Sequence, residues 1–259
     1  MPALHPALLH IQAIAFDLDG TLYENDVPIP GAIETVSAVR AAGLSVRFVT
    51  NTTSISRRLI AARLQRIGFR LEAEELFCPA RAAAAWLQRE SASAAFFVPE
   101  PALEDFEGVA RNLDRPDVVV IGDLESGWTF ESMNRAFRLV HDQGARLVGL
   151  GRTRYWRGPC GLQLDVGPFL AALEYATGKA AVVFGKPEPA FFAGLVEDLA
   201  EPAGRVAMIG DDIMSDVGAA MSAGLLGVLV RTGKFDPRDL DGSFRPDLVI
   251  GSIADAVEI

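Results

Sequence analysis

Short apolar runs alternate along this chain with longer segments in which apolar residues recur every three or four positions. The runs at 44–50, 117–123 and 205–212 have the length and composition of buried strands. Residues 30–43 instead place Ile33, Val36 and Val39 on one face of a helix. Because strand and helix alternate, the pattern predicts a parallel sheet with crossover helices packed against it.

The domain division is predicted from the positions of polar motifs, because composition marks no linker, repeat or low-complexity segment. We expect an α/β fold: a Rossmann-like, doubly wound parallel sheet core that carries an inserted α/β cap domain. The core is predicted at residues 1–79 and 185–259, and the cap at residues 80–184. The insertion therefore splits the core into two segments of sequence.

Composition and charge limit the partners that this protein is expected to bind. Hydrophobic residues make up 50% of the 259 positions, and 24 basic against 34 acidic residues give a formal charge of −10. Such a surface repels nucleic acid and anionic membranes, so we expect neither as a partner. No apolar stretch is long enough to span a bilayer, and the first residues lack a basic segment, so we expect a cytoplasmic protein.

Two residue types argue against other kinds of chemistry. The three histidines are not clustered with another motif, which disfavours a histidine-based triad or a zinc site. Cys78 and Cys160 are interpreted as reduced thiols, with a disulfide between them as the alternative.

Asp17 and Asp19 follow the first apolar strand, in the stretch "DLDGTLY". Both carboxylates lie on one face if the strand continues, whereas Gly20 and Thr21 supply a turn if it does not. Two acids this close do not both ionise cheaply without a cation, and Mg²⁺ prefers such oxygen ligands. One carboxylate could then attack phosphorus while the other handles a proton; alone, the pair is more typical of a polar turn after a strand.

Three further motifs follow predicted strands, where ligands bind in open α/β sheets. Thr50-Asn51 offers a hydroxyl and a backbone amide to a phosphoryl oxygen, although both residues are also common in turns. Lys186, in "GKP", could neutralise carboxylates and phosphate, or could simply be solvated. The acids of "GDDIMSD" are Asp211, Asp212 and Asp216, of which Asp212 could instead cap the following helix.

The order DxDGT, TN, GKP and GDDxxxD resembles the haloacid dehalogenase superfamily of phosphohydrolases over essentially the whole chain. The resemblance implies Asp17 as the nucleophile that forms an aspartyl-phosphate and Asp19 as the general acid/base. It also implies a phosphate site at Thr50 and Asn51, with Lys186 steadying the nucleophile and phosphate. Mg²⁺ would be held by Asp17, Asp19 (through its backbone carbonyl) and Asp211. Asp216 and Asp212 would support these ligands without binding the metal directly.

The position of the insert resembles the type-two capped branch of this family, in which a cap closes over the site. The stretches "GLQLDVGPFLAALEYATG" and "VRTGKFDPRDL" are similar to the subgroup of phosphatases for phospholysine, phosphohistidine and inorganic pyrophosphate, with its hydrolase-domain relatives. The segment "GRTRYWRGPCG" takes the place of the substrate-specificity loop. A cationic, aromatic loop with Tyr155, Trp156 and Arg157 would recognise the leaving group, and a solvated loop or a subunit contact is the alternative.

We therefore expect a Mg²⁺-dependent phosphatase for a small phosphorylated metabolite, phosphoamide or pyrophosphate. Alternatives are a phosphatase for a sugar phosphate, nucleotide or pyridoxal phosphate, a phosphoryl-transferring mutase, and a non-catalytic binding protein on the same scaffold. The sequence names neither the physiological substrate nor the oligomeric state, although the resemblance implies a homodimer formed through the cap. Asp123 and Glu125, which follow the strand at 117–123, are interpreted as cap structure.

Overall fold

The computed structural model describes residues 3–158 and 161–258. It separates into two compact units. The first comprises Met1–Thr50, Arg58–Phe77 and Phe192–Ile259, and the second comprises Asn51–Arg57 and Cys78–Phe191. The predicted cap boundaries at 79/80 and 184/185 remain a prediction. The division into units falls at 77/78 and 191/192, and it also assigns Asn51–Arg57 to the second unit.

The first unit is built on a six-stranded parallel sheet in the order β15-β14-β13-β2-β5-β6. From one edge to the other, its strands are Leu248–Ile250, Leu226–Val230, Val206–Gly210, Ala13–Asp17, Ser45–Val49 and Leu76–Phe77. The central strands β2 and β13 are buried along their whole length, as expected when helices cover both faces of a parallel sheet. The α/β fold predicted from the alternation is confirmed.

Sheet order places a switch point between β2 and β13. The chain runs outward from β2 to β5 and β6, then returns to the other side of β2 and continues through β13, β14 and β15. Ligands of open α/β sheets bind at the carboxyl ends of the strands where the order reverses in this way. Residues that follow Asp17 and Gly210 therefore occupy the position where this fold places chemistry.

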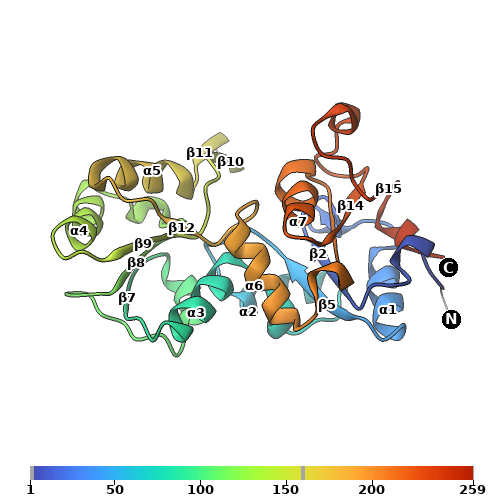
Figure 1. Ribbon diagram of the computed structural model, residues 1–259, viewed down its shortest axis with the longest axis horizontal. Coiled ribbons are helices and arrows are strands. Elements are labelled where there is room, and N and C mark those ends of the chain that lie inside the picture. The colour runs from blue at the N-terminus through green and yellow to red at the C-terminus, as the bar shows by residue number, and fades with distance from the viewer. Residues whose placement is uncertain (1–2, 159–160, 259) are drawn as a thin grey trace. The chain divides into compact units, whose positions relative to one another are not determined.

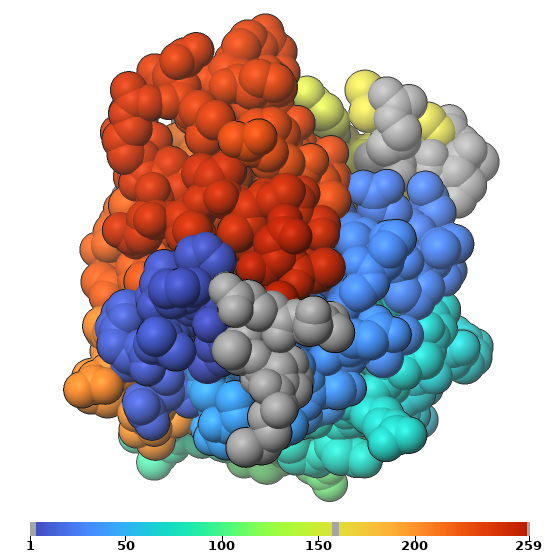
Figure 2. All heavy atoms as spheres, turned by 90° about the vertical axis from the view of Figure 1, so that its right-hand side faces the viewer, coloured from blue at the N-terminus to red at the C-terminus, as the bar shows by residue number. Residues whose placement is uncertain are grey.

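Helices and small ribbons complete the first unit. The helices are α1 (Ala32–Ala41), α2 (Arg57–Arg66), α6 (Pro189–Leu199) and α7 (Ala219–Ser222), of which α2 and α6 each include residues on both sides of a boundary between the units. The ribbons are β3 (Tyr23–Glu24) with β4 (Val27–Pro28), and β1 (Ala3–Leu4) with β16 (Val257–Glu258). Figure 2 shows the N-terminal segment, in dark blue, beside the C-terminal segment, in red, where the second ribbon forms.

The second unit contains a four-stranded parallel sheet in the order β12-β9-β8-β7. Its strands are Val182–Val183, Arg146–Gly149, Val118–Ile121 and Ala94–Phe97, and its helices are α3 (Pro79–Arg89), α4 (Phe130–His141) and α5 (Val166–Thr177). Helices α4 and α5 cover one face of this sheet and α3 lies on the other (Figure 1). An antiparallel hairpin of β10 (Tyr155–Gly158) and β11 (Gly161–Leu164) precedes α5.

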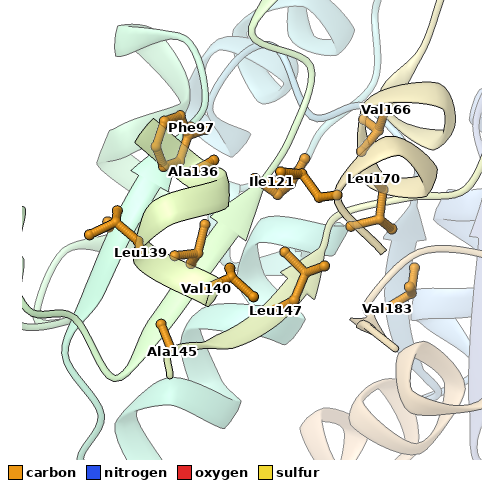
Figure 3. Packing of buried hydrophobic residues seen from close by; sticks show 13 residues of the cluster. Phe97, Ile121, Ala136, Leu139, Val140, Ala145, Leu147, Val166, Leu170 and Val183 are labelled. Carbon is orange, nitrogen blue, oxygen red and sulfur yellow. The ribbon is translucent and has the colours of Figure 1, made fainter. Parts of the chain in front are cut away.

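The core of the second unit explains why its elements hold their positions. Leu139 of α4 and Leu170 of α5 pack toward Ile121 and Leu147 of the sheet (Figure 3). These side chains recur at helical spacing on α4 and α5 and at alternate positions on the strands, which is the pattern that builds a two-layer core. Among the described residues, no helix combines the length and the apolar character that crossing a bilayer requires.

Candidate active site at the switch point of the core sheet

The first motif forms a turn rather than a longer strand. Strand β2 ends at Asp17, and the amides of Thr21 and Leu22 donate to the carbonyl of Leu18. Gly20 adopts a φ of +83°, a conformation that glycine tolerates and most other residues do not. The two acids therefore separate: Asp17 is buried, whereas the Asp19 side chain is exposed.

A tyrosine that the sequence motifs did not single out contacts Asp19. Burial raises the pKa of Tyr23, and the Asp19 carboxylate, which accepts a hydrogen bond from the Tyr23 hydroxyl, raises it further. The guanidinium of Arg63 lies 5.2 Å from the centre of the Tyr23 ring and pairs with Asp26 at 2.6 Å. Because its pKa is raised, the Tyr23 hydroxyl stays protonated at neutral pH, and its hydrogen bond can orient the exposed carboxylate of Asp19.

Asp17, Asp211 and Asp216 form a buried cluster at the switch point. One carboxylate oxygen from each lies within 4.8 Å of the others, and the residues are 8%, 1% and 1% exposed. Three carboxylates at this spacing repel one another, and burial makes their charges costly unless a cation compensates. Hard oxygen donors in this number suit Mg²⁺, so the residues fit the metal that the family pattern implies.

The loop at residues 231–234, which follows β14, holds Asp211 in place. The backbone N–H of Lys234 donates to Asp211 Oδ2 at 2.7 Å, and the hydroxyl of Thr232 donates to the carbonyl of Gly20 at 2.5 Å. A Cβ atom added to either Gly20 or Gly233 would collide with Asp211 Oδ2. The loop thus ties the Asp211 carboxylate to the turn that follows Asp17.

Asp212 has a capping role, one of the two alternatives raised by its position. Its Oδ1 accepts from the amides of Met214 (3.0 Å) and Ser215 (2.9 Å). Burial opposes ionisation, but the hydrogen bonds from Ser215 and the charge of Lys234, whose Nζ is 3.5 Å away, lower the pKa of Asp212.

The helix predicted after Asp212 begins with a π-helical turn and not as a regular α-helix. Residues Ile213–Gly218 form a π-helical turn before the short α7. Both Asp216 and Val217 donate their amides to the carbonyl of Asp212, which widens the turn. Such widened turns occur frequently at functional sites, and here the turn carries Asp216 of the carboxylate cluster.

Thr50 and Asn51 are adjacent in the sequence, and the division into units falls between them. Thr50 lies directly after β5, is buried, and ends the first of the three segments that make up the first unit. In the second unit, the Asn51 side chain accepts from the Lys186 amide at 2.8 Å and donates to the Lys186 carbonyl at 2.9 Å. The two hydrogen bonds of the Asn51 side chain therefore fix the backbone of the buried Lys186. The backbone amide of Asn51 is the group predicted to bind phosphate.

The segment after Asn51 is anchored by an ion pair between Arg57 and a buried carboxylate. Asp105, 8% exposed, accepts from both the backbone amide and Nε of Arg57 at 3.0 Å. Cys78 is a free, buried thiol 3.9 Å from Asp105, and burial raises its pKa to about 12, so it stays protonated. Cys160 lies outside the described residues.

We predict that Asp105→Asn lowers the free energy of unfolding by about 2 kcal/mol, because the buried carboxylate is the charged acceptor of two hydrogen bonds from Arg57. Glu90→Gln, which breaks the half-exposed pair of Glu90 with Arg146 in the same unit, should cost under about 1 kcal/mol. Urea unfolding of both variants measures the difference. Equal losses would show that the Arg57 pair is not what anchors this segment.

The hairpin β10–β11 carries the predicted specificity residues. Tyr155 and Trp156 are 51% and 41% exposed, and the side chain of Arg157 lies outside the described residues. Arg152 is already paired with both carboxylate oxygens of Glu174, at 2.7 and 2.9 Å, and Arg154 lies 5.9 Å from the centre of the Tyr155 ring. Tyr155 and Trp156 are therefore available to a ligand, whereas Arg152 serves the local structure.

Comparison with known proteins places the whole chain in one family. Residues 14–110 match a family described as haloacid dehalogenase-like hydrolase, and residues 183–256 match a second model of HAD-like hydrolases. A haloacid dehalogenase-like hydrolase domain-containing protein 2 from Rattus norvegicus is 41% identical over 88% of this chain and 87% of its own length. A phospholysine phosphohistidine inorganic pyrophosphate phosphatase from Xenopus laevis is 37% identical over 96% of this chain and 94% of its own.

Solved structures show the same fold. A 4-nitrophenylphosphatase from Thermotoga maritima superposes with a TM-score of 0.88 at 25% identity, covering 97% of this chain and 98% of its own. A p-nitrophenyl phosphatase from Archaeoglobus fulgidus gives a TM-score of 0.86 at 28% identity, covering 95% and 97%. The identity and the coverage of these matches agree with the four motifs, and this chain belongs to the haloacid dehalogenase-like hydrolase family.

Proposed function

We propose that this protein is a Mg²⁺-dependent phosphatase that hydrolyses a small phosphorylated metabolite, phosphoamide or pyrophosphate through an aspartyl-phosphate on Asp17. The observation that carries the proposal is the buried cluster of Asp17, Asp211 and Asp216 at the switch point of the core sheet. A fold that needed only stability would not bury three mutually repelling carboxylates at its ligand-binding edge.

The proposed roles follow from burial and position. Asp17, at the end of β2, is the nucleophile, and the exposed Asp19, oriented by Tyr23, protonates the leaving group and then activates water. Asp17, Asp211 and the backbone carbonyl of Asp19 would hold Mg²⁺, which supplies positive charge to the phosphoryl oxygens when bound. Asp216 and Asp212 would support these ligands without binding the metal directly, and Asp212 would do so chiefly by capping the following helix.

The remaining groups bind the transferring phosphoryl group. In the proposal, the hydroxyl of Thr50 and the backbone amide of Asn51 hold its oxygens, and the ammonium of Lys186 neutralises charge that develops on them. The Asn51 side chain contributes indirectly, because its two hydrogen bonds fix the Lys186 backbone. Phosphoryl transfer depends mainly on such positioning and charge stabilisation.

The substrate class is drawn from the relatives. The name of the Xenopus laevis relative specifies phospholysine, phosphohistidine and inorganic pyrophosphate, which supports phosphoamides and pyrophosphate as substrates here. The nitrophenyl phosphatases among the structural relatives support phosphate esters as well, so sugar phosphates, nucleotides and pyridoxal phosphate are the alternative. An inserted cap at 80–184, a homodimer and a cytoplasmic location remain predictions.

Release of inorganic phosphate from a substrate panel tests this proposal. The panel contains pyrophosphate, phospholysine, phosphohistidine, pyridoxal phosphate, a nucleotide, a sugar phosphate and an aryl phosphate, each measured with Mg²⁺ and with EDTA. We expect Mg²⁺-dependent release from one or two members. Release that persists in EDTA would contradict the role of the metal, and binding without release from any member would favour the non-catalytic alternative.

A further inference from the structure

Lys234 contacts both of the consecutive acids that follow β13. Its backbone N–H donates to Asp211 Oδ2 at 2.7 Å, and its Nζ lies 3.5 Å from Asp212 Oδ2. All three residues belong to the first unit, in which the lysine lies on the segment between β14 and β15 (Figure 1). One residue thus brings a backbone donor and a positive charge to the edge of the carboxylate cluster.

Packing holds the segment that carries Lys234 against the π-helical turn at residues 213–218. Phe235, the next residue, and Phe244 both lie against a small buried cluster of that turn and β14. The buried side chains of this cluster are Ile213, Val217 and Leu229. The same turn carries Asp216, so the lysine backbone and the carboxylate cluster are held by one packed substructure.

Four carboxylates act on the ammonium group of Lys234. Desolvation disfavours its charged form, but the carboxylates more than offset this effect, so the pKa of Lys234 is raised. The four acids are Asp211, Asp212, Asp216 and Asp17, in decreasing order of effect. Three of them form the buried cluster. A positive charge beside mutually repelling carboxylates lowers the cost of keeping them ionised together.

A divalent cation and this ammonium compete for the same negative potential. Without a metal, the ammonium compensates part of the charge of the cluster. With a metal among the same carboxylates, the ammonium repels it, because like charges in a partly solvated site still interact. Loss of the ammonium should therefore destabilise the metal-free protein and strengthen metal binding.

We propose that Lys234 is the built-in counter-ion of the carboxylate cluster, which stabilises the metal-free protein and lowers its affinity for Mg²⁺. This role rests on the proposed function, because it takes the cluster as the Mg²⁺ site. Lys234 is then a residue that acts through the metal ligands and not a catalytic residue. Its charge moves the filling of the site to higher concentrations of free Mg²⁺.

Calorimetric titration of the full-length protein with Mg²⁺ alone, without substrate, tests this role. Lys234→Gln removes the charge but keeps the backbone amide that binds Asp211, and a side chain that is 69% exposed can be changed without disturbing a packed core. We expect this variant to bind Mg²⁺ roughly three- to tenfold more tightly than the parent. Lys234→Arg, which keeps the charge, should keep the affinity within about twofold of the parent value.

Arg205→Gln is the matched control for net charge. Arg205 is exposed and lies at the amino end of β13, whereas Asp211 follows the carboxyl end. Six steps of about 3.3 Å place their Cα atoms roughly 20 Å apart, beyond the Debye length at physiological ionic strength. This variant should therefore bind Mg²⁺ as the parent does.

Thermal unfolding gives a second readout that separates a counter-ion from a structural lysine. Lys234→Gln should unfold at a lower temperature than the parent in EDTA, and its midpoint should rise more when Mg²⁺ is added. A lysine that only held the loop in place would, when replaced, let Asp211 move and weaken Mg²⁺ binding. The sign of the change in affinity therefore distinguishes the two roles.

Two results would overturn the role of Lys234 alone. They are unchanged or weaker Mg²⁺ binding by Lys234→Gln, and an equal gain in affinity in Arg205→Gln. Absence of Mg²⁺ binding by the parent would overturn the metal site as well, and with it the proposed Mg²⁺-dependent phosphatase. The two failures are distinguishable, because only the second abolishes metal binding by the parent protein.

Discussion

Asp17→Asn should abolish phosphate release, with a loss of at least about 10³-fold, while the protein stays folded. The amide has the shape of the carboxylate but cannot form the acyl phosphate. It also removes one of three buried negative charges within 4.8 Å of one another, so the metal-free variant should be at least as stable as the parent. Phosphate release and thermal unfolding in EDTA measure the two effects.

A matched control separates the nucleophile from a general effect of losing an acid. Asp142→Asn changes an exposed aspartate at the end of α4 in the second unit and should leave both activity and stability unchanged. Substantial turnover by Asp17→Asn would remove Asp17 as the nucleophile. A large loss of stability would instead mean that its carboxylate is needed for folding, which the repulsion within the cluster argues against.

Gly233→Ala should give the second large effect, by displacing Asp211. The glycine has a φ of +62°, and a methyl group there would collide with Asp211 Oδ2 and the Gly20 backbone. Moving this carboxylate weakens the proposed metal site, so the Mg²⁺ concentration for half-maximal activity should rise roughly ten- to a hundredfold, as for other changes to groups that orient a metal ligand. Activity and thermal unfolding titrated with Mg²⁺ both report this shift.

Gly43→Ala is the matched control for backbone strain. Gly43 has a φ of +83°, but an added methyl group meets nothing within 4 Å. This variant should lose about 1–2 kcal/mol of unfolding free energy, the cost of a left-handed conformation, with no change in Mg²⁺ dependence. If Gly233→Ala shows the same modest loss and an unchanged Mg²⁺ titration, the loop at residues 231–234 does not position Asp211.

The fold class and the alternation of strands and helices could be predicted from the sequence, because the pattern of hydrophobic burial determines them. Strand β13 is an uninterrupted apolar run, which a parallel sheet covered on both faces requires, and the alternation with helices determined the fold class. The order of the acidic motifs followed, since successive strands of such a sheet present their carboxyl ends at one edge. The proximity of Asp17 and Asp211 could therefore be expected from the sequence alone.

Contacts between segments distant in sequence could not be predicted in this way. Nothing local to Lys234 indicates that its backbone amide binds Asp211, and Gly233 is an ordinary turn residue until the approach of Gly20 is known. Asp19 illustrates the same limit, because period two allowed it to face the cluster but the turn at Gly20 directs its side chain to solvent.

The most direct test of the account is to look for the phosphoryl group on the enzyme itself. The protein is mixed with Mg²⁺ and the best substrate of the panel, quenched rapidly in acid, digested, and analysed by mass spectrometry. We predict one phosphoryl group on the peptide that contains Asp17, removable by hydroxylamine and absent from Asp17→Asn. Rapid phosphate release with an unmodified Asp17 peptide, or with the phosphoryl group on another residue, would contradict the proposed mechanism.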